Sequence, residues 1–155
     1  MQNFLTQLII GVGMTAIGAF AADNSLGTWK LNMEKSKFSP SVPVKGLTAV
    51  REASDGGVKV TITGAQATGN PINASYTAKY DGSESPVTGA PYDTISIKQV
   101  NADTFTEVRS SKKNAKYGLT GRTVVSKDGK TLTNSLKGTS ADGQAYSAVM
   151  VWDKQ

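Results

Sequence analysis

The residue types that most often carry catalysis or bind metals are absent from this chain. Neither cysteine nor histidine occurs among its 155 residues. Disulfides, thiolate nucleophiles, metal sites built on Cys or His, and Ser-His or Cys-His catalytic arrangements are therefore excluded. Carboxylates remain, but no two of them have a spacing that selects a general acid and its base. We expect a protein that is not an enzyme and that holds neither a cofactor nor a metal ion.

One pair of opposite charges raises a question about the interior. Glu107 and Arg109 alternate in phase with Phe105 in a segment that is expected to be extended. If these three side chains point inward, the ion pair is costly to desolvate unless it is fully hydrogen-bonded or hydrated, and a polar cavity follows. If the alternate side chains from Thr104 to Val108 point inward instead, the pair is exposed. The sequence leaves both alternatives open.

Arg109 also begins a basic stretch, with four cations in the eight residues 109–116, and the chain carries a net charge of +5. Such a stretch can form a patch for phosphates or acidic polymers. It can equally be a solvated hairpin tip at which Lys112 and Lys113 discourage edge-to-edge strand pairing. Nucleic-acid binding requires aromatic side chains for base stacking, and only Tyr117 is near, so we expect no nucleic-acid partner.

Turn signals divide the chain into short segments. Asp-Gly pairs at 55–56, 81–82, 128–129 and 142–143 are typical of tight hairpin turns, because glycine accepts a positive φ without steric cost. The segments between turns alternate apolar and polar residues, which indicates strands rather than helices. Longer loops are predicted at 64–71 and 84–91. About nine strands are predicted, near 26–32, 46–54, 58–64, 72–80, 92–100, 104–112, 116–126, 130–138 and 144–153.

These strands predict an all-β fold. Short connections make neighbouring strands antiparallel, and an up-and-down meander of eight or nine strands removes its exposed edges by closing into a barrel. Residues 33–46, with Pro40 and Pro43, interrupt the pattern. A short helical turn at Met33–Phe38 would be followed by an extended return. This segment either runs over the surface, with Phe38 plugging the base of the barrel, or crosses one end as a partial lid.

Residues 1–21 resemble a signal peptide. Phe4 to Phe20 carries no charge, and Ala19-Phe20-Ala21 fits the small-residue cleavage signal. No Lys or Arg precedes this stretch, and the alternative is an uncleaved membrane anchor. We expect cleavage before Ala22, which leaves residues 22–155 as one domain. The mature protein is then periplasmic or secreted, monomeric, and not an integral membrane protein.

The segment Gly27-Thr28-Trp29-Lys30-Leu31 carries a resemblance to known families. It is similar to the G-x-W signature of lipocalins and to the G-T-W-K opening of fatty-acid-binding proteins. The resemblance implies a barrel around an apolar ligand cavity, with Trp29 closing one end. Three features depart from these families: no room exists for a helix pair within 33–46, the second lipocalin motif T-D-Y is absent, and the last strand lacks the Arg-x-Tyr that grips a ligand carboxylate. Overall, the chain most closely resembles secreted bacterial proteins without a characterised activity.

The aromatic residues supply the candidate binding residues. Large and small side chains alternate on one face of two predicted strands, which in a small barrel either fits the taper of a filled core or leaves a cavity. We therefore expect a non-catalytic protein that binds a small, largely apolar ligand inside the barrel, and a fatty acid that binds little better than its neutral alcohol. The alternative is a structural or envelope-associated interaction protein that uses a basic outer surface. The expected lining residues are Tyr76, Tyr80, Tyr117, Tyr146, Met150 and Trp152.

Overall fold

The structure is a computed structural model that describes residues 22–155, so the expected signal peptide, residues 1–21, lies outside the described residues. Every regular element from Ala22 onward is a strand, and this part of the chain has no helix long and apolar enough to cross a membrane. The eleven strands are β1 (Gly27–Leu31), β2 (Lys37–Ser39), β3 (Val44–Ser54), β4 (Gly57–Gln66), β5 (Pro71–Lys79), β6 (Asp81–Thr88), β7 (Thr94–Asn101), β8 (Thr104–Ser110), β9 (Gly118–Val125), β10 (Thr131–Thr139) and β11 (Ala145–Lys154).

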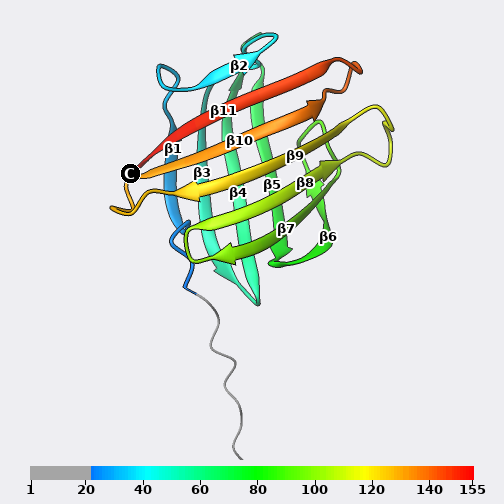
Figure 1. Cartoon of the computed structure of the whole chain (residues 1–155). Helices are drawn as coiled ribbons and strands as arrows, with labels where there is room; N and C mark the ends of the chain where they lie inside the picture. Colours follow the sequence, from blue (N-terminus) through cyan, green and yellow to red (C-terminus); the bar gives the residue numbers. More distant parts are fainter. Residues whose placement is uncertain (1–21) are drawn as a thin grey trace, which may run out of the picture.

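The strands form one closed antiparallel barrel (Figure 1). Each strand from β3 to β10 pairs with the next strand along the chain, and β1 pairs with both β3 and β11. The register that closes the barrel places Leu31 opposite Trp152. The expected all-β, up-and-down barrel is therefore confirmed, with ten strands in the closed ring instead of eight or nine. The eleventh strand, β2, pairs only with the first half of β11.

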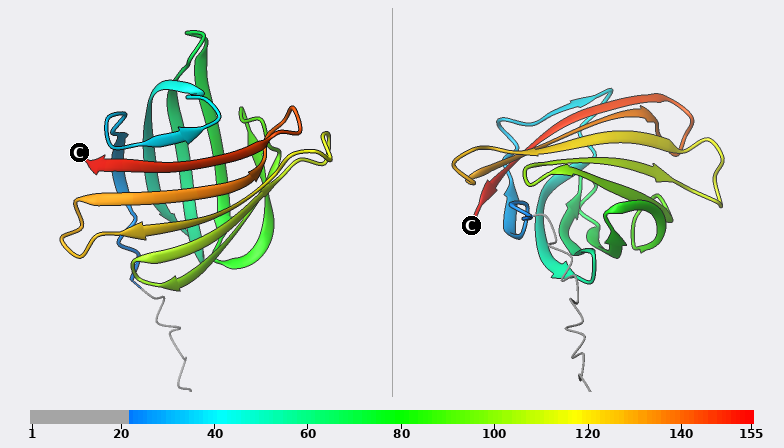
Figure 2. Two further views of the ribbon diagram at one scale, coloured as in Figure 1. Left: turned by 45° about the horizontal axis from the view of Figure 1, so that its top comes forward. Right: turned by 60° about the horizontal axis from the view of Figure 1, so that its bottom comes forward.

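The barrel has two different ends, which we call the base and the mouth (Figure 2). The base contains the N-terminal segment 22–26 and the turns at 55–56, 102–103 and 126–130. The mouth contains the loops 40–43, 67–70, 89–93, 111–117 and 140–144. Because consecutive strands run in opposite directions, the hairpin turns alternate between these two ends.

Strand β6 was not expected, since the sequence predicted a loop over 84–91. The segment contains Pro86, which cannot donate a ladder hydrogen bond, and it lacks the run of β-branched residues that marks a strand. Its pairing is correspondingly sparse: β6 meets β5 only at Ser75↔Thr88 and Tyr76↔Val87. Pairing with β7 and the burial of Val87 against the core hold the segment extended. Tertiary contacts therefore override a weak local preference.

The segment between β1 and β3 also differs from expectation. Residues 33–35 form a turn without a helix, and Lys37–Ser39 becomes β2 through pairing with Ala148 and its neighbours on β11. Phe38 was expected to plug the base if the segment ran over the surface. It lies instead at the mouth, half-buried against the core cluster, because β2 follows the first half of β11, which starts at the mouth.

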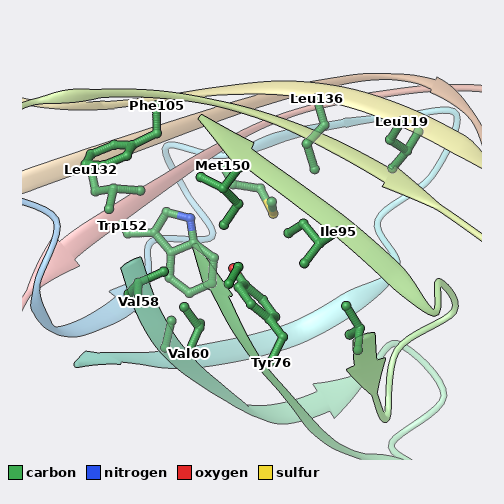
Figure 3. Close-up of a cluster of buried hydrophobic side chains, with 14 of the residues drawn as sticks. Val58, Val60, Tyr76, Ile95, Phe105, Leu119, Leu132, Leu136, Met150 and Trp152 are labelled. Atoms are coloured by element: carbon green, nitrogen blue, oxygen red, sulfur yellow. The ribbon is translucent and has the colours of Figure 1, made fainter. Parts of the chain in front are cut away.

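The apolar core lies inside the barrel. Trp29, Val58, Val60 and Ile95 are the largest side chains that are almost completely buried. Figure 3 shows the side chains of Val58, Val60 and Trp152 gathered in this cluster. Burial of this kind provides the main stabilisation of a barrel without disulfides.

The N-terminal segment closes the base from below. The Trp29 indole Nε1 donates a hydrogen bond to the Ser25 carbonyl at 2.8 Å, and Ser25 is fully buried. The Asn24 backbone N donates to the Ala102 carbonyl at 3.0 Å, and Gln99 Nε2 donates to the Ala22 carbonyl at 2.9 Å. Trp29 therefore lies where the resemblance to lipocalins placed it, at one end of the barrel.

Candidate ligand-binding cavity

A cavity of about 570 Å³ occupies the barrel interior between the base and the mouth. Its floor includes Trp29 and Trp152, and its rim includes Phe38, Pro43 and Ala141. Cavities that hold small molecules in proteins have volumes of roughly 300–1,000 Å³ and mostly apolar walls. This cavity has the size of such a site, and its walls are mostly apolar with a small number of polar side chains.

The structure brings together five of the six candidate binding residues. Tyr76, Tyr117, Tyr146, Met150 and Trp152 all line the cavity. They share the inward phase that alternation along their strands indicated, and their role in binding stays a prediction.

Tyr80 is the candidate that does not line the cavity. It lies at the base, where its hydroxyl donates a hydrogen bond to Asp23 Oδ2. Its ring packs against Phe105, with ring centroids 5.0 Å apart. Tyr76 and Tyr80 lie on the same face of the chain, four residues apart. Because a strand rises by about 3.3 Å per residue, this spacing places Tyr76 in the cavity wall and Tyr80 beneath the floor.

The phase of β8 is resolved in favour of an interior ion pair. Phe105 and Glu107 are buried, whereas Val108 is 50% exposed. Arg109 Nε donates to Glu107 Oε2 at 2.7 Å, and both residues line the cavity. The cavity therefore contains a polar centre, as the first alternative implied. Arg109 lies inside the barrel and does not belong to the basic stretch on the outer surface.

Neighbouring strands complete the hydrogen bonding of Glu107. Asn134 on β10 donates through Nδ2 to Glu107 Oε1 at 2.5 Å and to Thr123 Oγ1 at 2.9 Å. Glu107 reaches across β9 because Gly121 stands opposite it: a Cβ at that position would lie 2.8 Å from Glu107 Cγ. The absent side chain of Gly121 makes room for the carboxylate.

The charge state of this centre follows from its partners. Burial alone would raise the pKa of Glu107, but the charge and hydrogen bond of Arg109, with the hydrogen bond from Asn134, hold that pKa below its usual value. Glu107 also helps to raise the pKa of Arg109 against burial. Both groups are therefore charged at neutral pH.

A second arginine enters the cavity from the opposite wall. Arg51 on β3 donates through Nε to Ser25 Oγ at 3.1 Å, and its guanidinium carbon lies 6.0 Å from the centre of the Phe105 ring. Ser25 in turn donates to Asp23 Oδ1, from its backbone N at 2.8 Å and from Oγ at 2.6 Å. Arg51 thus links the closed base to the cavity.

Sequence reasoning did not identify Arg51 or Asn134 as functional candidates. A signal was present in both cases, because each polar residue occurs in the apolar phase of its strand. Arg51 alternates with Leu47 and Ala49, and Asn134 alternates with Leu132 and Leu136. A polar side chain in an inward phase is an indicator of an interior polar site.

The basic stretch at the mouth contains three lysines once Arg109 is removed. Lys112 is exposed and lies 3.5 Å from Glu84. The Asp93 carboxylate accepts backbone hydrogen bonds from Lys112 and Lys113 and a hydroxyl hydrogen bond from Ser111. Local hydrogen bonding accounts for the conformation of this loop, and the loop adds no observation in favour of the interaction-protein alternative.

No protein-family model and no curated protein matches the sequence. Among solved structures, the chain is similar to the zebrafish ileal bile acid-binding protein complexed with cholic acid, with a TM-score of 0.51 and 12% identity over 86% of this chain and 100% of that chain. The fold is lipocalin-like and similar to that of fatty-acid-binding proteins.

Two further barrels match less well. EF1p2_mFAP2b bound to DFHBI has a TM-score of 0.49 and 10% identity, over 85% of this chain and 94% of that chain. The redesigned barrel mFAP1 bound to DFHBI has a TM-score of 0.45 and 14% identity, over 88% of this chain and 100% of that chain.

Proposed function

We propose that this protein binds a small, largely apolar molecule inside its barrel without catalysing a reaction. The observation that carries the proposal is the cavity of about 570 Å³, whose lining runs without a break from the floor at Trp29 and Trp152 to the loops of the mouth. A barrel that served only as a structural element would gain stability by filling this volume with side chains. The similar zebrafish barrel is complexed with cholic acid, which supports the same use of the fold here.

Binding is tested with a neutral fluorescent probe of apolar character. We expect micromolar or tighter affinity, because the cavity is preformed and mostly apolar. We also expect a change in tryptophan fluorescence, because Trp29 and Trp152 both line the cavity. Native mass spectrometry of the protein purified from its own cells then identifies any retained ligand.

A matched pair of variants locates the site. Ile72 lines the cavity near the mouth, whereas its neighbour Asn73 is exposed on the outer face. Ile72→Trp fills the entrance and is expected to weaken probe binding by at least about tenfold, while Asn73→Trp leaves it unchanged. Equal loss in both variants, or no loss in either, contradicts binding inside the barrel.

We also propose that the mature protein begins at Ala22 and is periplasmic or secreted. The support is the apolar, uncharged segment from Phe4 to Phe20 with its Ala19-Phe20-Ala21 signal. Cleavage before Ala22 leaves intact the Asp23 and Ser25 contacts that close the base. Expression in a Gram-negative host followed by intact-mass analysis of the soluble periplasm tests this. An uncleaved chain in the membrane fraction contradicts it.

A further inference from the structure

A second hollow lies on the outside of the barrel, and we call it the outer groove. It crosses four strands that lie side by side, β9, β10, β11 and β2 (Figure 1). The middle residue of each contributing triplet is in the inward phase, and the two flanking residues are exposed. The exposed side chains therefore form the walls of the groove and the strand backbone forms its floor. The triplets are 120–122, 135–137, 147–149 and 37–39.

The exposed side chains of the outer groove form two rows across the strands. Strand register defines each row, because neighbouring members are directly paired. Neighbouring strands lie about 4.8 Å apart, so each row spans roughly 14 Å from β9 to β2. This length suits an extended chain that lies across the strands. The first row consists of Arg122, Ser135, Val149 and Lys37, and the second of Thr120, Lys137, Ser147 and Ser39.

The outer groove is positively charged. Its lining contains Lys37, Arg122 and Lys137 and no carboxylate. None of these three cations forms an ion pair within residues 22–155. Arg122 and Lys137 lie on strands that are paired on both sides, so protection of an open sheet edge does not account for them. The groove therefore has an uncompensated charge in the middle of a sheet face.

The wall formed by β3 to β7 is different, because strand register there places carboxylates opposite cations. Glu52 on β3 stands opposite Lys59 on β4, and Asp81 on β6 stands opposite Lys98 on β7. Positive charge is thus balanced on that wall and unbalanced in the outer groove. Such a local excess attracts a partner of opposite charge.

The shape and side chains of the outer groove narrow the chemistry of this partner. A second copy of the chain on a symmetric interface would bring the same cations face to face, which is unfavourable. Nucleic-acid bases stack on aromatic side chains, and none of the eight exposed side chains in the two rows is aromatic. A flat lipid surface does not follow a hollow, whereas a chain can lie in it. Between the cations, the exposed hydroxyls can both donate hydrogen bonds to sugar hydroxyls and accept them. They belong to Ser39, Thr120, Ser135 and Ser147.

We propose that the outer groove binds an acidic polysaccharide, a chain of sugars whose carboxylates contact Lys37, Arg122 and Lys137. The serine and threonine hydroxyls bind the sugar hydroxyls between these contacts. This inference goes beyond the proposed function, because the groove lies on the outer face of the sheet and the cavity on the inner face. The loop 111–117 contributes no residue to the groove.

The test measures fluorescence anisotropy of end-labelled polygalacturonate oligomers, with neutral dextran oligomers of the same length as the control. At about 50 mM salt we expect the acidic oligomer to bind at least about tenfold more tightly than the neutral one. The affinity should fall at least about tenfold at about 500 mM salt, because exposed charges are then screened. No binding of the acidic oligomer, or equal affinity for both oligomers, overturns the inference.

Two other anionic partners are measured beside the oligomer. Double-stranded DNA and vesicles of phosphatidylglycerol are added at the same concentration of negative charge. We expect both to bind more weakly than polygalacturonate, because neither combines an extended single chain with sugar hydroxyls along its length. Binding of either one as tightly as the oligomer overturns the assignment to a polysaccharide.

A matched pair of triple variants locates the binding. Each variant replaces three exposed cations by glutamine, so both lose the same net charge. We expect the groove variant to lose at least about 30-fold in affinity for polygalacturonate and the control variant less than about threefold. Equal losses would show a response to overall charge and overturn the groove as the site. The groove variant carries K37Q, R122Q and K137Q, and the control variant carries K59Q, K79Q and K98Q.

The cavity probe serves as an internal check on the fold of these variants. The neutral fluorescent probe should bind both triple variants as it binds the wild type, since no substituted residue lines the cavity. If the groove variant does not fold, the single variants K137Q and K59Q make the same comparison. An equal affinity of these two single variants for polygalacturonate then overturns the inference.

Discussion

The base and the mouth of this barrel are formed by the same strands, but they differ in hydrogen bonding and in the exposure of their apolar side chains. At the base, the polar groups have partners: Ser25 is fully buried, yet its carbonyl, backbone N and hydroxyl all take part in hydrogen bonds. At the mouth, Phe38 and Tyr146 are only partly buried, and Pro43 is exposed although it lines the cavity. Ser25 at the closed end is thus satisfied, whereas above it, among residues 22–155, the enclosed Asn134 Oδ1 has no hydrogen-bond partner.

This difference separates stability from binding. A hydrogen-bonded, fully packed end resists local opening, and an end with exposed apolar side chains opens at lower cost. The cavity therefore opens toward the mouth, and Glu107, Arg109 and Asn134 place a polar centre in its wall. The base forms the closed floor of the cavity.

The largest expected effect comes from the floor. Trp29→Ala removes a fully buried indole and its hydrogen bond to the Ser25 carbonyl, and we expect a loss of about 3–5 kcal/mol in the free energy of unfolding. Phe38→Ala at the mouth is the matched comparison, with an expected loss of about 1 kcal/mol because the ring is only partly buried. Urea denaturation measures both variants. A larger loss for Phe38→Ala would contradict the division between the two ends.

The polar centre between the two ends is tested through its acid dependence. Glu107 has a lowered pKa in the folded protein, so its ionisation stabilises the fold above the unfolded pKa of 4.5. That stabilisation is lost as the pH falls through the folded pKa. Glu107→Gln is expected to cost about 3 kcal/mol at pH 7, because it leaves the largely buried Arg109 without its counter-ion. The difference between wild type and variant should shrink below about pH 4.5. A difference that does not depend on pH would show that Glu107 is not ionised in the folded state.

Smaller effects on stability are expected from replacing one aspartate at each end of the barrel. Asp23→Ala removes the acceptor for Ser25 and Tyr80 at the base, and we expect a loss of about 2 kcal/mol in the free energy of unfolding. Asp142→Ala at the mouth removes only an exposed contact with Ser140, and we expect less than about 0.5 kcal/mol. Hydrogen exchange of the Asn24 and Trp29 amides in Asp23→Ala would reveal whether the base opens. Unchanged protection there would argue against Asp23 as part of the closure.

Much of the architecture was predictable because its causes are local. Asp-Gly turns and period-two alternation depend on residues next to one another in the chain, and they correctly predict an antiparallel barrel. The inward phases of Tyr76, Met150 and Trp152 follow from the same alternation. Strand β6 was missed because Pro86 and its polar neighbours weaken the local signal, while the contacts that hold it extended come from β7 and the core.

The polar chemistry of the interior was decided by the tertiary structure alone. The alternation around Phe105 is equally compatible with both faces of β8, and burial of Glu107 becomes acceptable only because Asn134 on β10 and the space above Gly121 on β9 are brought to it. Arg51 belongs to a different wall, and its approach to the Phe105 ring on β8 depends on the closure of the ring. The sequence by itself determined the repeating pattern that forms strands. Only the closed barrel determined which charged groups meet, because their partners lie on strands far apart in the chain and a low-dielectric interior makes each unpaired charge costly.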